Sequence, residues 1–280
     1  MRFILFTIVA ICLTFSSAFA ESPLKYGISS MLSASNTFIH YEELNSYIAE
    51  KLGITSEIIH KENYSDMNRL IENQQVDFAS ICTGAMLYLN EGSYQLVAAP
   101  EIDGKTTYSS LIIKNKNVQA DLPEDLKGKT FAMTDRLSNT GFLFPTYYFS
   151  RNFSAPEQFF SKVFFTGTHD KSIYLVNKGV VDAAAVDNLV YDNLKSQSEN
   201  NVRNIEIIHE SPEFGIPPIV ASKKMTSDEI KILRQILLNM HQDKQGKKIL
   251  EELMIDRFTV PDISVYANVI KMRDYVENNK

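Results

Sequence analysis

Three short polar residues, Ser138, Asn139 and Thr140, stand in succession before Gly141 and an apolar run that we expect to be a helix. Residues of these types cap helix N-termini. A helix start also presents unpaired N–H groups and the positive end of the helix dipole, and added side-chain donors would suit a tetrahedral oxyanion. A plain cap and an anion-binding site both remain open. The segment lacks the P-loop spacing GxxxxGK[ST], so ATP hydrolysis is not indicated.

Two further residues could serve chemistry. His169, followed by Asp170, opens an expected helix, and Asp187 ends an alanine-rich strand, where it either caps the next helix or meets a ligand. Ser138, His169 and Asp187 also form a hydrolase triad on paper, but no GxSxG, HExxH or paired-carboxylate motif supports catalysis. We therefore expect no catalytic residue and no cofactor. The remaining histidines stand singly without metal-ligand spacing, so we expect no metal site: His40, His60, His209 and His241.

The elements that must position these residues alternate between strand and helix. The first series predicts strands at 25–30, 54–60, 76–82, 94–100 and 107–114, and helices at 35–52, 64–75 and just after 82. The second predicts strands at 129–133, 162–167, 180–186, 204–210 and 217–222, and helices at 141–152, 170–179, 188–195, 226–242 and 244–254. This alternation implies βαβ units, an α/β fold and largely parallel sheets.

An internal repeat suggests how the series are organised. Val76-Asp77 and Val181-Asp182 each follow a helix and a polar turn and lead into a strand of small residues. This predicts two similar lobes, lobe 1 comprising 21–112 plus 217–280 and lobe 2 comprising 113–216. The chain would cross near 115 and return at 211–218, with the last helices on lobe 1. Two crossings make a hinge, and the cleft between such lobes favours a ligand.

The first twenty residues have the pattern of a signal peptide. Arg2 precedes an apolar run of 13 residues, 3–15, which is shorter than the roughly 20 residues of a membrane span. Ala18-Phe19-Ala20 is a small-x-small cleavage site, so we expect an exported, soluble mature chain beginning at Glu21. Cys82 then remains alone and cannot form an internal disulfide, and its apolar strand context predicts a buried, inert thiol.

Composition limits the partners. The chain has 280 residues, is 44% hydrophobic and carries a net charge of −6. It can bury a substantial core, which excludes disorder or a coiled coil as the main state. A general nucleic-acid binder would be basic, so we expect no nucleic-acid partner.

The sequence resembles the periplasmic substrate-binding proteins of phosphate, phosphite and phosphonate ABC transporters. The resemblance covers nearly all of the mature chain. It is strongest in YGISSMLSASNTF (26–38), TDRLSNTGFLFPTYY (134–148), FFTGTHDKSI (164–173), VDAAAVDNLVYD (181–192) and FGIPPIV (214–220). It implies the two-lobed type II periplasmic binding fold, with the phosphorus-bound oxygens of the ligand between the lobes.

The resemblance also implies which residues face the ligand: Tyr64, Tyr108, Ser138, Asn139, Thr140, His169 and Asp187. Many relatives have Ser-Thr-Ser where this chain has Ser138, Asn139 and Thr140, and all three residues still donate hydrogen bonds. Asp187 falls where relatives place a carboxylate near the far end of the ligand. Some phosphonate binders carry another Asp in the turn that is GIPP (215–218) here, so a cationic aminoalkyl tail would have fewer partners.

The expected function is that of a periplasmic solute receptor. It would bind phosphate, phosphite or a small phosphonate and deliver it to a permease and its ATPase subunits at the inner membrane. We expect a monomer. Two alternatives stay open, a ligand-sensing subunit of a membrane sensor kinase and an exported hydrolase.

Overall fold

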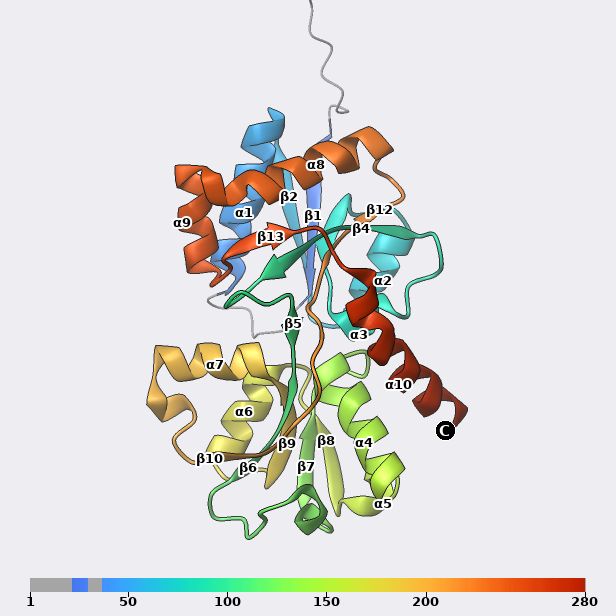
Figure 1. The fold of residues 1–280 in the computed structure, drawn as a ribbon, viewed down its shortest axis with the longest axis vertical. Coiled ribbons are helices and arrows are strands. Elements are labelled where there is room, and N and C mark those ends of the chain that lie inside the picture. Colours follow the sequence, from blue (N-terminus) through green and yellow to red (C-terminus); the bar gives the residue numbers. More distant parts are fainter. Residues whose placement is uncertain (1–21, 30–36, 280) are drawn as a thin grey trace, which may run out of the picture.

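The computed structural model describes residues 22–29 and 37–279, with the backbone alone for 37–40. The expected signal peptide, 1–20, lies outside the described residues, as do residues 30–36. The described chain forms two α/β lobes, each built on its own sheet (Figure 1). No helix within these ranges combines the length and the apolar character needed to cross a membrane.

The first lobe, in blue, cyan and orange in Figure 1, contains a six-stranded sheet of order β13-β4-β12-β3-β1-β2. β1 pairs in parallel with β2 and β3, while the pairs β12–β3, β12–β4 and β13–β4 are antiparallel. The strands are β1 (Leu24–Ser29), β2 (Ser56–Lys61), β3 (Phe78–Ser80), β4 (Tyr94–Glu101), β12 (Ile219–Ser222) and β13 (Arg257–Thr259).

The second lobe, in green and yellow, contains a five-stranded sheet of order β10-β6-β9-β7-β8. β7 pairs in parallel with β8 and β9, while β6 is antiparallel to β9 and β10. The strands are β6 (Ser110–Asn115), β7 (Thr130–Met133), β8 (Lys162–Phe165), β9 (Ala183–Asp187) and β10 (Ile205–Glu210).

The expectation of largely parallel sheets is wrong for the strand pairs, because each sheet contains only two parallel pairs, and β12 and β13 in the first sheet and β6 in the second run against their neighbours. Parallel neighbours need a crossover connection, usually a helix. β6 and β12 instead enter their sheets directly from the other lobe. The chain passes from the first lobe to the second through β4 and β6 and returns through β10 and β12. The pairs β4–β12 and β6–β10 are therefore antiparallel.

Between the sheets, the two passages of the chain pair with each other. β5 (Thr107–Tyr108) is antiparallel to β11 (Phe214–Gly215), with Tyr108 opposite Phe214. Pairing within the second sheet begins at Ser110, and pairing within the first resumes at Ile219. This short ribbon is the connection visible between the lobes in Figure 1.

Helices cover both faces of each sheet. In the first lobe they are α1 (Thr37–Leu52), α2 (Tyr64–Glu72), α3 (Thr83–Met86), α8 (Ser227–Asn239) and α9 (Lys244–Glu252), and in the second α4 (Phe144–Asn152), α5 (Pro156–Phe159), α6 (His169–Asn177) and α7 (Asn188–Gln197). Short 3-10 turns lie at η1 (Pro123–Leu126), η3 (Glu199–Asn201), η4 (Met240–Gln242) and η5 (Ile263–Tyr266), and a π-helical turn at η2 (Asn139–Leu143). Successive residues of β6 point to opposite faces of the second sheet. Ile112 packs against α4 on one face, and Ile113 packs against α6 and α7 on the other.

The chain does not end with the two helices expected at 226–242 and 244–254. β13 and a further helix, α10 (Ala267–Asn278), follow them. α10 buries Val269, Met272 and Val276, a helical spacing, in the core of the second lobe beside α4. Figure 1 shows α10, in red, descending from the first lobe along α4.

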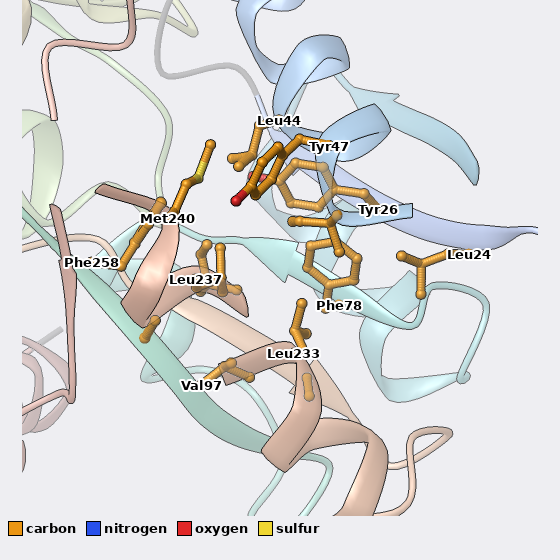
Figure 2. Close-up of a cluster of buried hydrophobic side chains, with 14 of the residues drawn as sticks. Leu24, Tyr26, Leu44, Tyr47, Phe78, Val97, Leu233, Leu237, Met240 and Phe258 are labelled. Carbon is orange, nitrogen blue, oxygen red and sulfur yellow. The ribbon is translucent and has the colours of Figure 1, made fainter. Parts of the chain in front are cut away.

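The first-lobe core lies between β1, β3 and the helices α1 and α8 (Figure 2). Tyr26 and Phe78 stack with ring centroids 4.4 Å apart, and Leu44 from α1 and Leu237 from α8 are fully buried in the same cluster. Burying side chains of this size stabilises the fold by roughly 1.5–3 kcal/mol each. This packing holds β1 and β3 in a fixed position, and the ends of these strands point toward the second lobe.

The repeated Val-Asp pair has one structural role in both lobes. Asp77 precedes β3 and accepts a hydrogen bond at 2.6 Å from the backbone N–H of Lys25 at the start of β1. Asp182 precedes β9 and accepts one at 2.8 Å from the N–H of Thr130 at the start of β7. Each aspartate thus ties a strand to its parallel neighbour. The repeat correctly predicted two lobes of similar construction.

Candidate functional site

The polar triplet lies where β7 gives way to the π-helical turn. Ser138 is the N-cap, and its Oγ accepts a hydrogen bond from the N–H of Gly141 at 3.0 Å. Ser138, Asn139 and Thr140 are all fully buried. The expected cap is therefore present. It uses the Ser138 side chain, which leaves the side chains of Asn139 and Thr140 available for other contacts.

Gly141 is required by a close approach to the end of β7. A Cβ at this position would lie 1.9 Å from Oγ1 of Thr134, and the Thr134 N–H donates to the Gly141 carbonyl at 3.1 Å. The turn thus folds back tightly on the strand. π-helical turns inside helices are often found at functional sites. Here the turn places the triplet against α3 of the first lobe.

His169 is the first residue of α6 and is 1% exposed. Its Nδ1 accepts a hydrogen bond from the N–H of Asp187 at 3.0 Å. Burial lowers the pKa of His169 to about 4, so the ring is neutral at pH 7. A neutral imidazole with an accepting Nδ1 carries its proton on Nε2. Nε2 lies 3.4 Å from Ser138 Oγ and is therefore a donor aimed at the polar turn.

Asp187 ends β9 and caps α7. Its Oδ1 accepts a hydrogen bond from the N–H of Leu189 at 2.9 Å, as the capping interpretation predicted. The carboxyl group is also 2% exposed, and burial raises its pKa to about 7. Capping needs one carboxylate oxygen, so the cap and a ligand contact are compatible.

The two tyrosines come from the first lobe and from the hinge. Tyr64 is the first residue of α2, and Tyr108 lies in β5. Asn139 Nδ2 donates to the Tyr108 hydroxyl at 3.1 Å, which joins the triplet to the hinge. Burial raises the pKa of both tyrosines well above the ordinary value, and each is raised further by nearby acidic groups that include Asp187. The structure thus brings all seven expected residues together.

Several buried oxygen atoms here lack a hydrogen-bond partner among the described residues. They are Tyr64 Oη, Thr134 Oγ1, Asn139 Oδ1 and Thr140 Oγ1. A buried polar atom without a partner is unfavourable by about 1–3 kcal/mol, and native proteins contain few of them. Such atoms gathered at one place, on elements of both lobes, indicate a site that a polar ligand completes.

The lobes touch directly beside this site. Asp135, just after β7, accepts a hydrogen bond at 3.2 Å from the Tyr64 N–H at the start of α2. A Cβ at Gly84 would lie 2.3 Å from the Leu137 carbonyl oxygen and 2.5 Å from the Asn139 nitrogen. Sequence reasoning assigned no role to Asp135.

Cys82 precedes α3 at the same junction and is 3% exposed. Burial raises the pKa of its thiol, against the influence of nearby N–H groups that include Asn139. The thiol is buried and free, as predicted. Within the described part of the chain, no group of three His, Cys, Asp or Glu side chains could hold a metal ion.

Comparisons with known proteins identify the family. Residues 26–266 match the family described as "ABC transporter, phosphonate, periplasmic substrate-binding protein". The chain is 26% identical over 199 residues to the probable ABC transporter phosphite binding protein PhnD1 of Prochlorococcus marinus, covering 67% of this chain and 66% of that protein. It is 26% identical over 241 residues to the phosphonates-binding periplasmic protein of Escherichia coli, covering 83% and 70%.

Solved structures share the fold. A binding protein component of an ABC phosphonate transporter from Pseudomonas aeruginosa superposes with a TM-score of 0.85 at 22% identity, covering 92% of this chain and 87% of that one. The structure of Prochlorococcus marinus PhnD1 in complex with methylphosphonate superposes with a TM-score of 0.83 at 21% identity. The match covers 92% of this chain and 99% of that one. The two lobes and the match across residues 26–266 lead to one conclusion: this chain belongs to the periplasmic substrate-binding proteins of phosphonate ABC transporters.

Proposed function

We propose that this protein is the solute receptor of an ABC importer and binds phosphate, phosphite or a small phosphonate between its lobes. The observation that carries the proposal is the cluster of buried polar groups, several of them without partners, contributed by both lobes and the hinge. The named activities of the relatives, phosphite and phosphonate binding, support the same ligand class.

In this proposal the oxyanion is held by neutral donors. Ser138, Asn139, Thr140 and the Nε2–H of His169 hold it from the second lobe. The Tyr64 hydroxyl reaches it from the first lobe, and Tyr108 lies at the hinge. A ligand favours the closed form only through contacts that are better in that form. Tyr64 supplies such a contact, because it lies on the opposite lobe from the triplet.

We infer that the protein does no chemistry on its ligand. In a hydrolytic triad the histidine donates from Nδ1 to a carboxylate and accepts the serine proton at Nε2. Here Nδ1 of His169 accepts the Asp187 N–H, so Nε2 already carries the proton. The ring is therefore in the wrong tautomer to act as a base for Ser138.

The test is calorimetric titration of a ligand-stripped sample with phosphate, phosphite and methylphosphonate. At least one should bind, and small-angle scattering should then show a more compact particle. Binding by none of the three would overturn the proposal. A phosphatase assay on the same sample should show no turnover.

We also propose export with removal of residues 1–20, a mature chain starting at Glu21, and a monomer that docks on a permease and its ATPase subunits. N-terminal sequencing of the exported protein checks the cleavage. An intact Met1 in the membrane fraction would contradict it. Sedimentation of the purified chain checks the monomer.

A further inference from the structure

Ser110, to which sequence reasoning assigned no role, lies where both passages of the chain enter the second lobe. It is the first residue of β6, two residues after the hinge strand β5, and it is fully buried. Its N–H donates to Oγ of Ser211 at 2.8 Å, and the Ser211 N–H donates to the Ser110 carbonyl at 2.9 Å. Because Ser211 belongs to the returning passage, this pair fixes the second-lobe end of the hinge.

The hydroxyl of Ser110 makes a separate contact, with the polar turn η2. Its Oγ donates to the Thr140 carbonyl at 2.6 Å, and the two residues are 30 positions apart in the chain. Thr140 is also fully buried. Because a carbonyl can only accept, the proton of the Ser110 hydroxyl is used in this bond and is not available to a ligand.

The sequence of the turn explains why a hydroxyl is needed there. In a π-helical turn each N–H donates to the carbonyl five residues earlier. The Phe144 N–H donates in this way to the Asn139 carbonyl. The next donor in the series would belong to Pro145, which has no N–H. The Thr140 carbonyl therefore loses its π-helical partner, and the Ser110 hydroxyl takes the place of that donor.

This bond holds one end of a peptide unit whose other end is also held. The Thr140 carbonyl and the Gly141 N–H belong to the same planar peptide. The Gly141 N–H donates to Oγ of Ser138 at 3.0 Å, while the carbonyl accepts from Ser110. Glycine allows more backbone rotation than other residues, so this peptide needs such restraint. Two serine hydroxyls, one in the turn and one at the hinge, thus fix its orientation.

We propose that Ser110 is a positioning residue of the anion site, because its hydroxyl supplies the hydrogen bond that Pro145 cannot. It keeps the turn in one geometry, so that the donors of Ser138 and Thr140 are preorganised for the oxyanion. Binding to preorganised donors is stronger, since less ordering is needed when the ligand arrives. The inference rests on the proposed function and extends it to a residue that does not contact the ligand.

Alanine substitutions at neighbouring serines test the role in binding. Ser110→Ala should weaken binding of phosphate, phosphite or methylphosphonate about tenfold in titration calorimetry. Ser109→Ala is the matched control. Ser109 is 2% exposed, and its hydroxyl donates to Glu210 at 2.7 Å and not to the turn. This control should leave the affinity nearly unchanged, and melting temperatures verify that both variants are folded.

A second substitution on another element should restore the lost affinity. Pro145→Ala returns an N–H to the position five residues after Thr140, where it can donate to the same carbonyl. In the Ser110→Ala background it should recover most of the affinity. In the wild-type background it should change the affinity little, because the carbonyl already has a donor. Comparison of the two backgrounds cancels any loss of packing at the proline.

Hydrogen exchange without ligand provides an independent measurement. The amide protons of Gly141 and Phe144 should exchange faster in Ser110→Ala than in wild-type protein, because the turn is less restrained. Their exchange should slow again when Pro145→Ala is added. Ser109→Ala should leave both rates unchanged.

The results distinguish failure of the inference from failure of the proposed function. The inference is overturned if Ser110→Ala binds with wild-type affinity, if Ser109→Ala causes the same loss, or if Pro145→Ala recovers nothing. Unchanged exchange at Gly141 and Phe144 would overturn it as well. If phosphate, phosphite and methylphosphonate all fail to bind wild-type protein, the proposed function fails, while the exchange rates still decide whether Ser110 holds the turn.

Discussion

The backbone N–H of Asp187 donates to Nδ1 of His169 at 3.0 Å and thereby fixes the tautomer of the imidazole. Because β9 ends at Asp187 and α6 begins at His169, a strand end and a helix start hold the ring between them. The proton on Nε2 then points into the site regardless of pH above about 5, since burial lowers the pKa of His169 to about 4.

His169→Gln should therefore be tolerated better than His169→Ala. A glutamine amide can replace the Nε2–H donor, whereas alanine removes it, and we expect alanine to weaken binding of the phosphorus oxyanion about tenfold to a hundredfold. Titration calorimetry of both variants checks this. Equal losses would exclude a donor role, and a wild-type affinity for methanesulfonate that falls as pH rises from 5 to 6.5 would point to an imidazolium instead.

His169 and Asp187 should make the stability of the folded protein depend on pH in opposite directions. His169 has a lowered pKa, so the unfolded state binds more protons between pH about 4 and 6.5, and stability falls as pH falls through that window. Asp187 has a raised pKa of about 7, so the native state binds more protons above pH 3.8, and stability falls as pH rises toward 7.

Asp187→Asn should consequently stabilise the ligand-free protein at pH 8 more than at pH 5, by up to about 2.7 kcal/mol, the equivalent of the two pH units between 5 and the raised pKa. His169→Gln should stabilise the ligand-free protein more at pH 5 than at pH 8, and so make it more resistant to acid unfolding. Urea unfolding at both pH values measures the two differences. The interpretation fails if each variant shifts stability equally at pH 5 and pH 8.

Ser138 and Thr140 should respond differently to alanine. The Ser138 hydroxyl caps the turn, so Ser138→Ala should lower stability by about 1 kcal/mol and also weaken binding. Thr140 Oγ1 makes no well-formed hydrogen bond among the described residues, although its hydroxyl lies close enough to Asp187 to lower the pKa of that carboxyl slightly. Thr140→Ala should weaken binding by about one to two powers of ten and leave the ligand-free melting temperature nearly unchanged.

Thr140→Ser is the matched control, because it keeps the hydroxyl and removes only a methyl group. Melting temperature and affinity should be measured on the same preparations. If both alanine variants lower the melting temperature but bind with wild-type affinity, the turn is a plain helix cap and the assignment of these donors is wrong.

Gly84→Ala should hinder closure. The added Cβ would lie 2.3 Å from the Leu137 carbonyl oxygen of the other lobe, and backbone cannot give way as a flexible side chain does. We expect binding to weaken at least about tenfold, the equivalent of 1.4 kcal/mol. The ligand-free melting temperature should not fall, since alanine suits α3 better than glycine. Scattering at saturating ligand should show a less compact particle than wild type.

Asp135→Asn should act in the same direction and more weakly, because it reduces the charge that accepts the Tyr64 N–H. Asp66→Asn is its matched control. Asp66 lies in the same first turn of α2, but its side-chain contacts with Asn63 and Arg69 stay within that turn. Equal effects of the two variants would show that only the charge at the helix start matters, and not the contact between lobes.

The sequence predicted those parts of the site that depend on neighbouring residues. Ser138 and Thr140 were found because cap residues and a glycine stand together, and His169 because it opens a helix. The contact between Asp135 and Tyr64 was missed, since 71 residues separate the two and only the approach of the lobes brings them together. No local sequence pattern indicates a contact between residues so far apart in the chain.

The same distinction holds for the fold. The Val-Asp repeat revealed two lobes because each aspartate acts within a single lobe. Strand direction was mispredicted at β6 and β12, where pairing depends on how the chain passes between lobes. α10 has a clear apolar spacing, but its partner helix α4 is more than a hundred residues away in sequence.

α10 also changes the mechanics of the molecule. Its chain leaves β13 in the first lobe, its apolar side packs on α4, and Arg273 donates to the Leu87 carbonyl next to α3 at 2.8 Å. A body joined to another by two adjacent strands can both swing and twist. A third tether, set apart from the first two, removes one of those freedoms. The two lobes should therefore close by one kind of rotation. Truncating the chain before α10 should weaken ligand binding, although it removes no residue that contacts the ligand.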